Sequence, residues 1–282
     1  MKLIIYLIIL ITLSFGKLLH PINNIEIETL LINKNEIDYY ILRGNECIYE
    51  IEGPKLINLY FRKPVPKKIN IPIDVSFNLR LDNTESLEFL ETLSISDNTK
   101  SKKHPAHSFS KSGKIQINIP KGKHQFRIKS KELPMLVRLT HQLKPKRRKS
   151  FISETDYNNN QILNVITGKK STPYSMLETG GNALFSFSED FEGDFWLYSR
   201  CIYNNESDFY QPYILNFNEN NKVVTSIFYS SISTQSKIEN IESYPGKLRT
   251  SYFSINSKDS EILIFNKSPN RNVLIRGEFI PK

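Results

Sequence analysis

The strongest constraint on this chain is a set of landmarks that occurs twice in the same order. Apolar segments of the first half end at Arg62 and Arg138, and their counterparts in the second half end at Arg200 and Arg276. The two arginines of each half are 76 residues apart. Equal order and equal spacing predict a tandem duplication, and two copies favour paired globular domains over a solenoid, which usually needs three or more repeats. The other matched landmarks are Gly44-Asn45 with Gly181-Asn182, Gly53 with Gly193, and Gly113-Lys114 with Gly246-Lys247.

Both copies consist of short runs in which apolar and polar residues alternate, as in 75–81 and 114–119. Such alternation places one side of a strand on a core and the other in water. We find no amphipathic helix of about 12 residues or more. The further predicted strands are 56–61, 87–95, 125–128, 135–139, 195–199, 213–217, 223–229, 261–265 and 272–279.

These patterns predict an all-β chain of two tandem antiparallel β-sandwich domains, jelly-roll or immunoglobulin-like, because each copy holds about seven or eight short strands. We expect a signal peptide over 1–16, a first, basic domain over 17–142, a linker over 143–160, and a second, aromatic-rich domain over 161–282. The linker opens with the cationic run 144–149. This run is interpreted as a solvated connection, with a contact patch or a protease-sensitive hinge as the alternatives.

The leader consists of Lys2, an apolar run over 3–13, and small residues at Ser14 and Gly16. A helix of that length spans roughly 16 Å, well short of the roughly 30 Å of bilayer hydrocarbon. We therefore expect a cleaved secretory signal and a secreted, periplasmic or cell-surface protein without a stable membrane span. A buried N-terminal strand or an uncleaved anchor is the alternative.

Positive charge is concentrated in the first half, which makes an acidic partner the expected one. Residues 1–150 hold 26 Lys+Arg and 14 Asp+Glu, whereas residues 151–282 hold 12 and 15. Cations at alternating positions share one exposed face of a strand. There they would bind an acidic polysaccharide or envelope polymer. The competing interpretation is that these charges only keep the protein soluble. Nucleic acid is not expected, since no recognition motif is present. The candidate binding lysines are Lys121, Lys123, Lys129 and Lys131.

Aromatic residues concentrate in the second half instead. Of the 32 Phe, Tyr and Trp residues, 21 follow residue 150, and they are densest around Trp196 and Tyr198. Exposed rings would stack on sugar faces, whereas inward rings would only fill the core. Core packing is the favoured interpretation, and a sugar-facing platform, with Trp196 and Tyr198 as the candidate binding residues, is the alternative.

A search for catalytic and metal sites finds no specific motif. His104, His107 and His124 could supply three nitrogens, but the lysine-rich neighbourhood repels cations, and we predict no metal and no cofactor. Cys47 and Cys201 are either two buried thiols or an interdomain disulfide. The repeated arginines are predicted to bond carboxylates or loop carbonyls as part of the scaffold.

We thus expect an exported, non-enzymatic β-sandwich protein with a binding, adhesion or envelope-structural role. Its expected partners are an acidic polysaccharide, an envelope polymer or another protein. The alternative is a carbohydrate-binding module or accessory domain of a carbohydrate-active enzyme.

Overall fold

The computed structural model of the chain describes residues 17–67, 69–132, 134–142, 155–156, 160–186, 192–205, 209–219, 222–255 and 261–281. Strands account for 70% of the described residues, and these residues contain no helix. The predicted all-β fold class is confirmed. Accordingly, the described part of the chain contains no helix that is long and apolar enough to cross a membrane.

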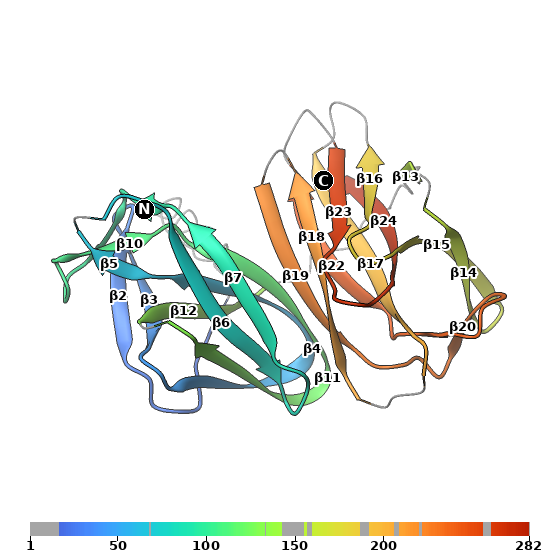
Figure 1. The fold of residues 1–282 in the computed structure, drawn as a ribbon, viewed down its shortest axis with the longest axis horizontal. Coiled ribbons are helices and arrows are strands. Elements are labelled where there is room, and N and C mark those ends of the chain that lie inside the picture. Colours follow the sequence, from blue (N-terminus) through green and yellow to red (C-terminus); the bar gives the residue numbers. More distant parts are fainter. Residues whose placement is uncertain are drawn as a thin grey trace, which may run out of the picture. The chain divides into compact units, whose positions relative to one another are not determined.

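Tertiary contacts divide the described residues into two compact units (Figure 1). Unit 1 comprises residues 17–79, 88–114 and 123–142, and unit 2 comprises the remainder. The first twelve strands are β1 (Leu18–Leu19), β2 (Ile27–Ile32), β3 (Asn35–Leu42), β4 (Glu46–Arg62), β5 (Pro64–Pro66), β6 (Ile73–Leu81), β7 (Leu87–Leu93), β8 (Ile95–Ser96), β9 (Thr99–Ser101), β10 (His107–Ser110), β11 (Gly113–Ser130) and β12 (Met135–His141). The others are β13 (Thr155–Asp156), β14 (Ile162–Thr167), β15 (Lys170–Leu177), β16 (Asn182–Ser186), β17 (Gly193–Tyr203), β18 (Gln211–Glu219), β19 (Lys222–Ser230), β20 (Ser236–Ile238), β21 (Tyr244–Pro245), β22 (Arg249–Ile255), β23 (Glu261–Asn266) and β24 (Val273–Pro281).

Unit 1 packs one layer of strands against another around a core of aromatic rings. Its main layer has the order β9-β2-β3-β12-β4, and β6 and β7 pair with each other and lie over that layer in Figure 1. Between the layers, the ring of Phe61 lies 4.8 Å from that of Phe77 and 6.0 Å from that of Phe89, measured between centroids. A small sheet, β5-β10-β8, carries the segment that leads into the candidate site.

Unit 2 is a second sandwich. One sheet has the order β20-β14-β15-β24-β17, with β22 also paired to β17, and the facing strands follow the order β13-β16-β23-β18-β19. Phe217 of β18 stacks on Phe253 of β22, with 3.8 Å between ring centroids. Apolar side chains of both sheets form the same buried cluster.

The two units share strand order and register in their main sheets. In β12, Leu136 lies opposite Arg62 and Arg138 opposite Tyr60. In β24, Leu274 lies opposite Arg200 and Arg276 opposite Tyr198. The order β9-β2-β3-β12-β4 is matched element by element by β20-β14-β15-β24-β17. This agreement is what the predicted duplication requires.

The two cysteines are free and buried, which corresponds to the first of the two alternatives, separate thiols. Burial raises the pKa of Cys47 to about 11 and that of Cys201 to about 12, because a thiolate is poorly solvated in the core. Neither thiol is therefore a ready nucleophile at neutral pH.

The predicted signal peptide lies outside the described residues, as does most of the predicted linker. The domain boundaries given above remain predictions.

Substitution of Gly113 tests the packing of unit 1. A Cβ atom at this position would lie 2.2 Å from Cζ of Phe61, so the buried ring would have to move. We expect Gly113→Ala to lower the free energy of unfolding by about 1–3 kcal/mol, measured by urea denaturation. Phe61→Leu alone should also destabilise, but the double variant should lose less than the sum of the single changes, because the clashing ring atoms are gone. Additive losses would contradict this account.

Glu91 should make stability depend on pH. It lies in β7 on the same inward face as Phe89 and Leu93, and burial raises the pKa of its carboxyl. The folded state therefore binds the proton more tightly than the unfolded state, and stability falls as the pH rises through the two pKa values. Glu91→Gln, which stays neutral, should raise the melting temperature at pH 7 and leave it nearly unchanged at pH 3.5. Glu52→Gln, at an exposed position, is the charge-matched control and should show no such contrast.

Candidate functional site

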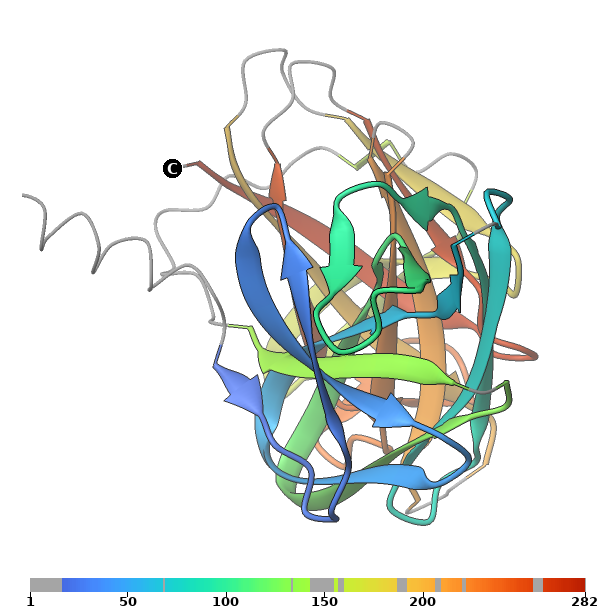
Figure 2. The same ribbon diagram turned by 90° about the vertical axis from the view of Figure 1, so that its left-hand side faces the viewer.

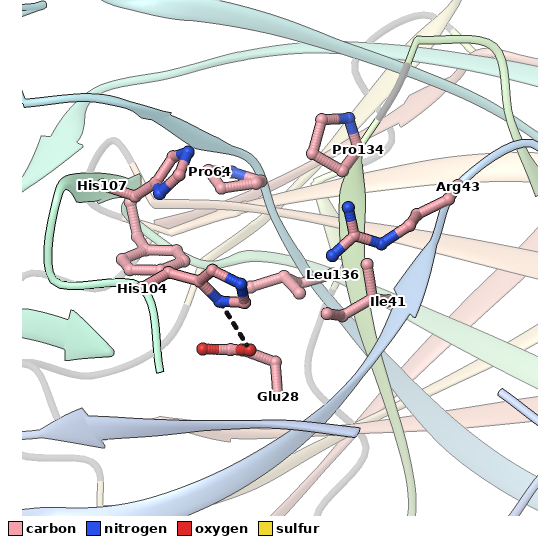
Figure 3. Close-up of a pocket in the computed structure, with 9 residues that line it drawn as sticks. Glu28, Ile41, Arg43, Pro64, His104, His107, Pro134 and Leu136 are labelled. Atoms are coloured by element: carbon pink, nitrogen blue, oxygen red, sulfur yellow. Dashed lines mark hydrogen bonds and ion pairs between the residues drawn. The ribbon is translucent and has the colours of Figure 1, made fainter. Parts of the chain in front are cut away.

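A small pocket in unit 1 gathers several polar side chains at one end of the main sheet (Figure 3). Its volume is about 80 Å³. Its walls come from strand ends and from the segment between β9 and β10, which lies beside β2 (Figure 2). The lining residues are Glu28, Ile41, Arg43, Pro64, His104, His107, Phe109, Pro134 and Leu136.

Glu28 is a carboxylate inside the protein. It lies on β2, on the same face as the core residue Leu30, and only 1% of the residue is exposed. The hydroxyl of Ser101 donates a hydrogen bond to Oε1, and Nδ1 of His104 lies 3.1 Å from Oε2. A buried carboxylate needs such partners, so these contacts fix its position.

A tight turn presents the two histidines. In the sequence His104-Pro105-Ala106-His107, the backbone N–H of His107 donates to the carbonyl of His104 at 3.1 Å, and proline sits at the second position of the turn, where its fixed φ is favourable. The backbone N–H of His104 donates to Ser101 Oγ at 2.8 Å. The two imidazole centroids are 5.8 Å apart and their planes are perpendicular.

Arg43 and apolar residues complete the pocket. In Figure 3 the guanidinium of Arg43 reaches into the pocket from the side opposite His107. Its Nε lies 3.6 Å from a carboxylate oxygen of Glu26, but both side chains are more than half exposed, so the pair is weak. Ile41, Phe109 and Leu136 form part of a buried cluster beneath the site.

A buried arginine holds the strands on both sides of the histidine turn. Nη1 of Arg62 donates to Thr99 Oγ1 at 3.1 Å and to the carbonyl of Ser110 at 2.6 Å, and Nε donates to the hydroxyl of Tyr39 at 3.2 Å. Thr99 begins β9 and Ser110 ends β10, so Arg62 fixes both ends of the segment that carries the histidines. In unit 2, Arg200 likewise donates to the carbonyl of Gly246, at 2.8 Å. The predicted scaffold role of these arginines agrees with both sets of contacts.

The arrangement of Glu28 and His104 defines what the pocket can do chemically. A carboxylate that binds Nδ1 orients the ring and leaves Nε2 for a ligand or a proton. The His104 side chain is 39% exposed, so a ligand can reach it. Of the nine lining residues, none offers a hydroxyl or a thiol as nucleophile, and only Glu28 is acidic. Among the described residues, no group of three or more His, Cys, Asp and Glu side chains is placed to hold a metal ion.

The four candidate lysines are exposed: Lys121, Lys123 and Lys129 lie on β11, and Lys131 follows the end of that strand. Their side chains alternate with the inward-facing residues His124, Phe126 and Ile128, as the pattern predicts. Neighbouring acids partly compensate this charge: Nζ of Lys131 lies 2.6 Å from Glu88, and Arg127 of β11 lies 3.7 Å from Glu46. Because a strand rises about 3.3 Å per residue, Lys123 and Lys129 are roughly 20 Å apart.

Trp196 and Tyr198 do not form an exposed platform. Trp196 is 2% exposed and Tyr198 is 7% exposed, and both belong to a buried apolar cluster with Tyr174 and Leu274. Tyr198 also donates a hydrogen bond to Glu278 at 2.9 Å. The physical reason is that both faces of this sheet carry apolar side chains, so the outward rings of β17 are buried as well as the inward ones. Their burial agrees with core packing and contradicts the alternative of an exposed sugar-stacking platform.

The site therefore coincides in part with residues that the sequence singles out. His104 and His107 come together, whereas His124 is buried on the inner face of β11. Glu28 and Arg43 were not predicted. Glu28 lies 76 residues before His104, and no local motif connects them.

Comparisons with known proteins give no family. No model of a known family matches the sequence, and no curated protein sequence matches it. Similar solved structures include tandem CBM51 modules of a family 98 glycoside hydrolase from Streptococcus pneumoniae, with 9% identity, coverage of 95% of this chain and 97% of that chain, and a TM-score of 0.28. A CBM22 tandem domain of Xyn10C from Paenibacillus barcinonensis has 9% identity, the same coverages and a TM-score of 0.25. The ANXUR2 extracellular domain from Arabidopsis thaliana has 9% identity, coverages of 96% and 91%, and a TM-score of 0.24. At TM-scores this low, the alignments carry no argument about function.

Removal of the Arg62 guanidinium should destabilise unit 1. Arg62→Leu leaves the buried carbonyl of Ser110 and the hydroxyl of Thr99 without this donor, and we expect a loss of about 2–4 kcal/mol in the free energy of unfolding. Arg43→Leu, at an exposed side chain, should change it by less than about 0.5 kcal/mol. Urea denaturation measures both variants. Equal effects would show that Arg62 does not hold the segment in place.

Proposed function

We propose that this chain is a non-catalytic binding protein for acidic polysaccharide and that the pocket beside Glu28 receives an anionic group of the polymer. The observation that carries the proposal is the convergence of Arg43, His104 and His107 on one accessible pocket. All three side chains donate hydrogen bonds from nitrogen, and arginine matches the geometry of a carboxylate or sulfate.

The size of the pocket supports one substituent rather than a whole ligand. Sites that enclose small organic molecules usually have volumes of about 300–1,000 Å³. This pocket, at about 80 Å³, suits a carboxylate or sulfate group whose sugar ring remains outside. The rings of Pro64 and Pro134 border it and would contact the apolar face of such a sugar.

The position of Glu28 supports an anion despite its own charge. Its two oxygens are engaged by Ser101 and His104, and its side chain is 2% exposed. The carboxylate therefore orients His104 from beneath, while the accessible part of the pocket presents nitrogen donors. The guanidinium of Arg43 on the opposite side favours an anionic group over a metal cation.

The lining residues also favour binding over turnover. Glycoside hydrolysis generally uses two carboxyl groups, roughly 5–9.5 Å apart, and acyl transfer uses a hydroxyl or thiol nucleophile. The nine lining residues provide one buried carboxylate and neither nucleophile. A carbohydrate-binding or adhesive role is thus the function that this geometry supports best, and the exposed lysines of β11 would add long-range attraction for the polymer.

The proposal includes a location outside the cell. The predicted leader over 1–16 is its basis. Acidic polysaccharides and envelope polymers are the anionic partners available there.

Binding to a heparin octasaccharide tests the proposal. We expect salt-dependent binding by isothermal titration calorimetry, and we expect Arg43→Gln and His107→Gln each to weaken it about tenfold, which corresponds to about 1.4 kcal/mol. Lys34→Gln, which removes one exposed charge outside the pocket, should change affinity less than twofold. Trp196→Phe should have no effect, because that ring is buried.

Two outcomes would overturn the proposal. The first is the absence of binding by the wild-type chain to acidic glycans. The second is an equal loss in Arg43→Gln and Lys34→Gln, which would reduce the interaction to bulk charge.

A further inference from the structure

A second, larger depression in unit 1 adjoins the histidine turn. Its volume is about 510 Å³, within the range of sites that hold small organic ligands. Pro105 and His107 of the turn line it, and His107 also lines the pocket beside Glu28. The lining residues of this groove are Lys67, Ile69, Asn70, Ile95, Ser96, Asp97, Thr99, Lys100, Ser101, Pro105, His107 and Ser108.

The groove is lined mainly by polar side chains of the kind that bind acidic sugars. Lys67 and Lys100 are exposed and contribute two positive charges, against one negative charge from Asp97. Ser96, Ser108 and Asn70 add hydroxyl and amide groups, which suit the hydroxyls of a sugar. The chemistry of the groove therefore resembles that of the pocket: cationic donors with neutral polar groups.

The wall of the groove is held in place by hydrogen bonds. The hydroxyls of Ser96 and Thr99 lie 2.8 Å apart, and Thr99 also accepts from Arg62. The backbone N–H of Lys67 donates to the carbonyl of Ala106 at 3.3 Å, which joins one side of the groove to the histidine turn. Next to this contact, His107 pairs with Pro66 in the small sheet. A fixed wall reduces the entropy that a ligand must overcome on binding.

We infer that this groove is a second subsite for the acidic polysaccharide and that the polymer passes over the turn at 104–107, with His107 contacted from both depressions. The inference rests on the proposed function and extends it from one anionic group to a chain of several sugars. Two linked subsites raise affinity through effective concentration, because the second contact forms within the same complex. The affinity for a longer oligosaccharide should therefore exceed the affinity for a short one. The increase should be larger than the additional negative charges alone would produce.

A comparison of ligand lengths tests the inference. Calorimetry would measure the affinity of the full chain for a heparin disaccharide and a heparin octasaccharide in the same buffer. We expect the octasaccharide to bind at least about tenfold more tightly. The double variant Lys67→Gln/Lys100→Gln should remove most of this difference and leave the disaccharide affinity within twofold. His107→Gln should weaken both ligands.

The matched control is Lys34→Gln/Lys170→Gln, which removes two exposed charges that line neither depression. It should keep the length dependence, and thermal melting would verify that both double variants are folded. Equal affinity of the wild-type chain for the two ligands, or equal losses in the two double variants, would overturn the second subsite while the pocket proposal stands. Failure of both ligands to bind the wild-type chain would overturn both proposals.

Discussion

The guanidinium of Arg62 is removed from water and can remain charged there only if protein groups replace the solvent. Tyr39, Thr99 and Ser110 do so, and they belong to three different strands, β3, β9 and β10. Because the buried charge of Arg62 requires these hydrogen bonds, it fixes the position of the segment from β9 to β10. The histidine turn is part of that segment. The geometry of the candidate site therefore depends on Arg62, although Arg62 does not line the pocket. Arg200 occupies the corresponding place in unit 2. Its guanidinium carbon lies 6.0 Å from the ring centroid of Tyr174, and the guanidinium carbon of Arg62 lies 5.9 Å from the ring centroid of Tyr39.

The site also shows how a sandwich separates core formation from binding. Along 124–128 of β11, every second side chain is buried in the core, and Arg127 of this stretch and Lys131 just beyond the strand are partly neutralised by Glu46 and Glu88. Strand ends and loops are free of that alternation, so residues of unlike chemistry can converge there. Arg43 follows β3 and His104 follows β9, while Glu28 reaches the site from within β2 because its neighbours Ser101 and His104 satisfy its charge.

Period-two alternation predicted strands such as β6, β12 and β24, because each has at least one face on a core, but it did not predict β2, β3, β14 or β15. It was not sufficient for Trp196, since alternation separates the two faces of a strand but does not say whether the outer face is covered. The pairing of Glu28 with His104 is a contact between distant segments and depends on the register of β2 with β9, which a single sequence does not encode locally. The geometry of the matching turns was not predicted either. The sequence matched Gly44 with Gly181, but the glycine with left-handed backbone in the turn between β15 and β16 is Gly180, because this turn is one residue longer than the turn between β3 and β4.

The length of β4 gives unit 1 a different internal mechanics from unit 2. β4 is one strand of 17 residues, whereas the corresponding stretch of unit 2 is divided between β16 and β17, which pair with β23 and β24 in different sheets. An unbroken strand transmits a local opening along its whole length, so its amides should exchange with solvent as one cooperative block. In unit 2 the two sheets are free to open separately, each at its own free energy. The duplicated halves would then share an architecture but respond differently to a pulling force, with unit 1 yielding in one step and unit 2 in two.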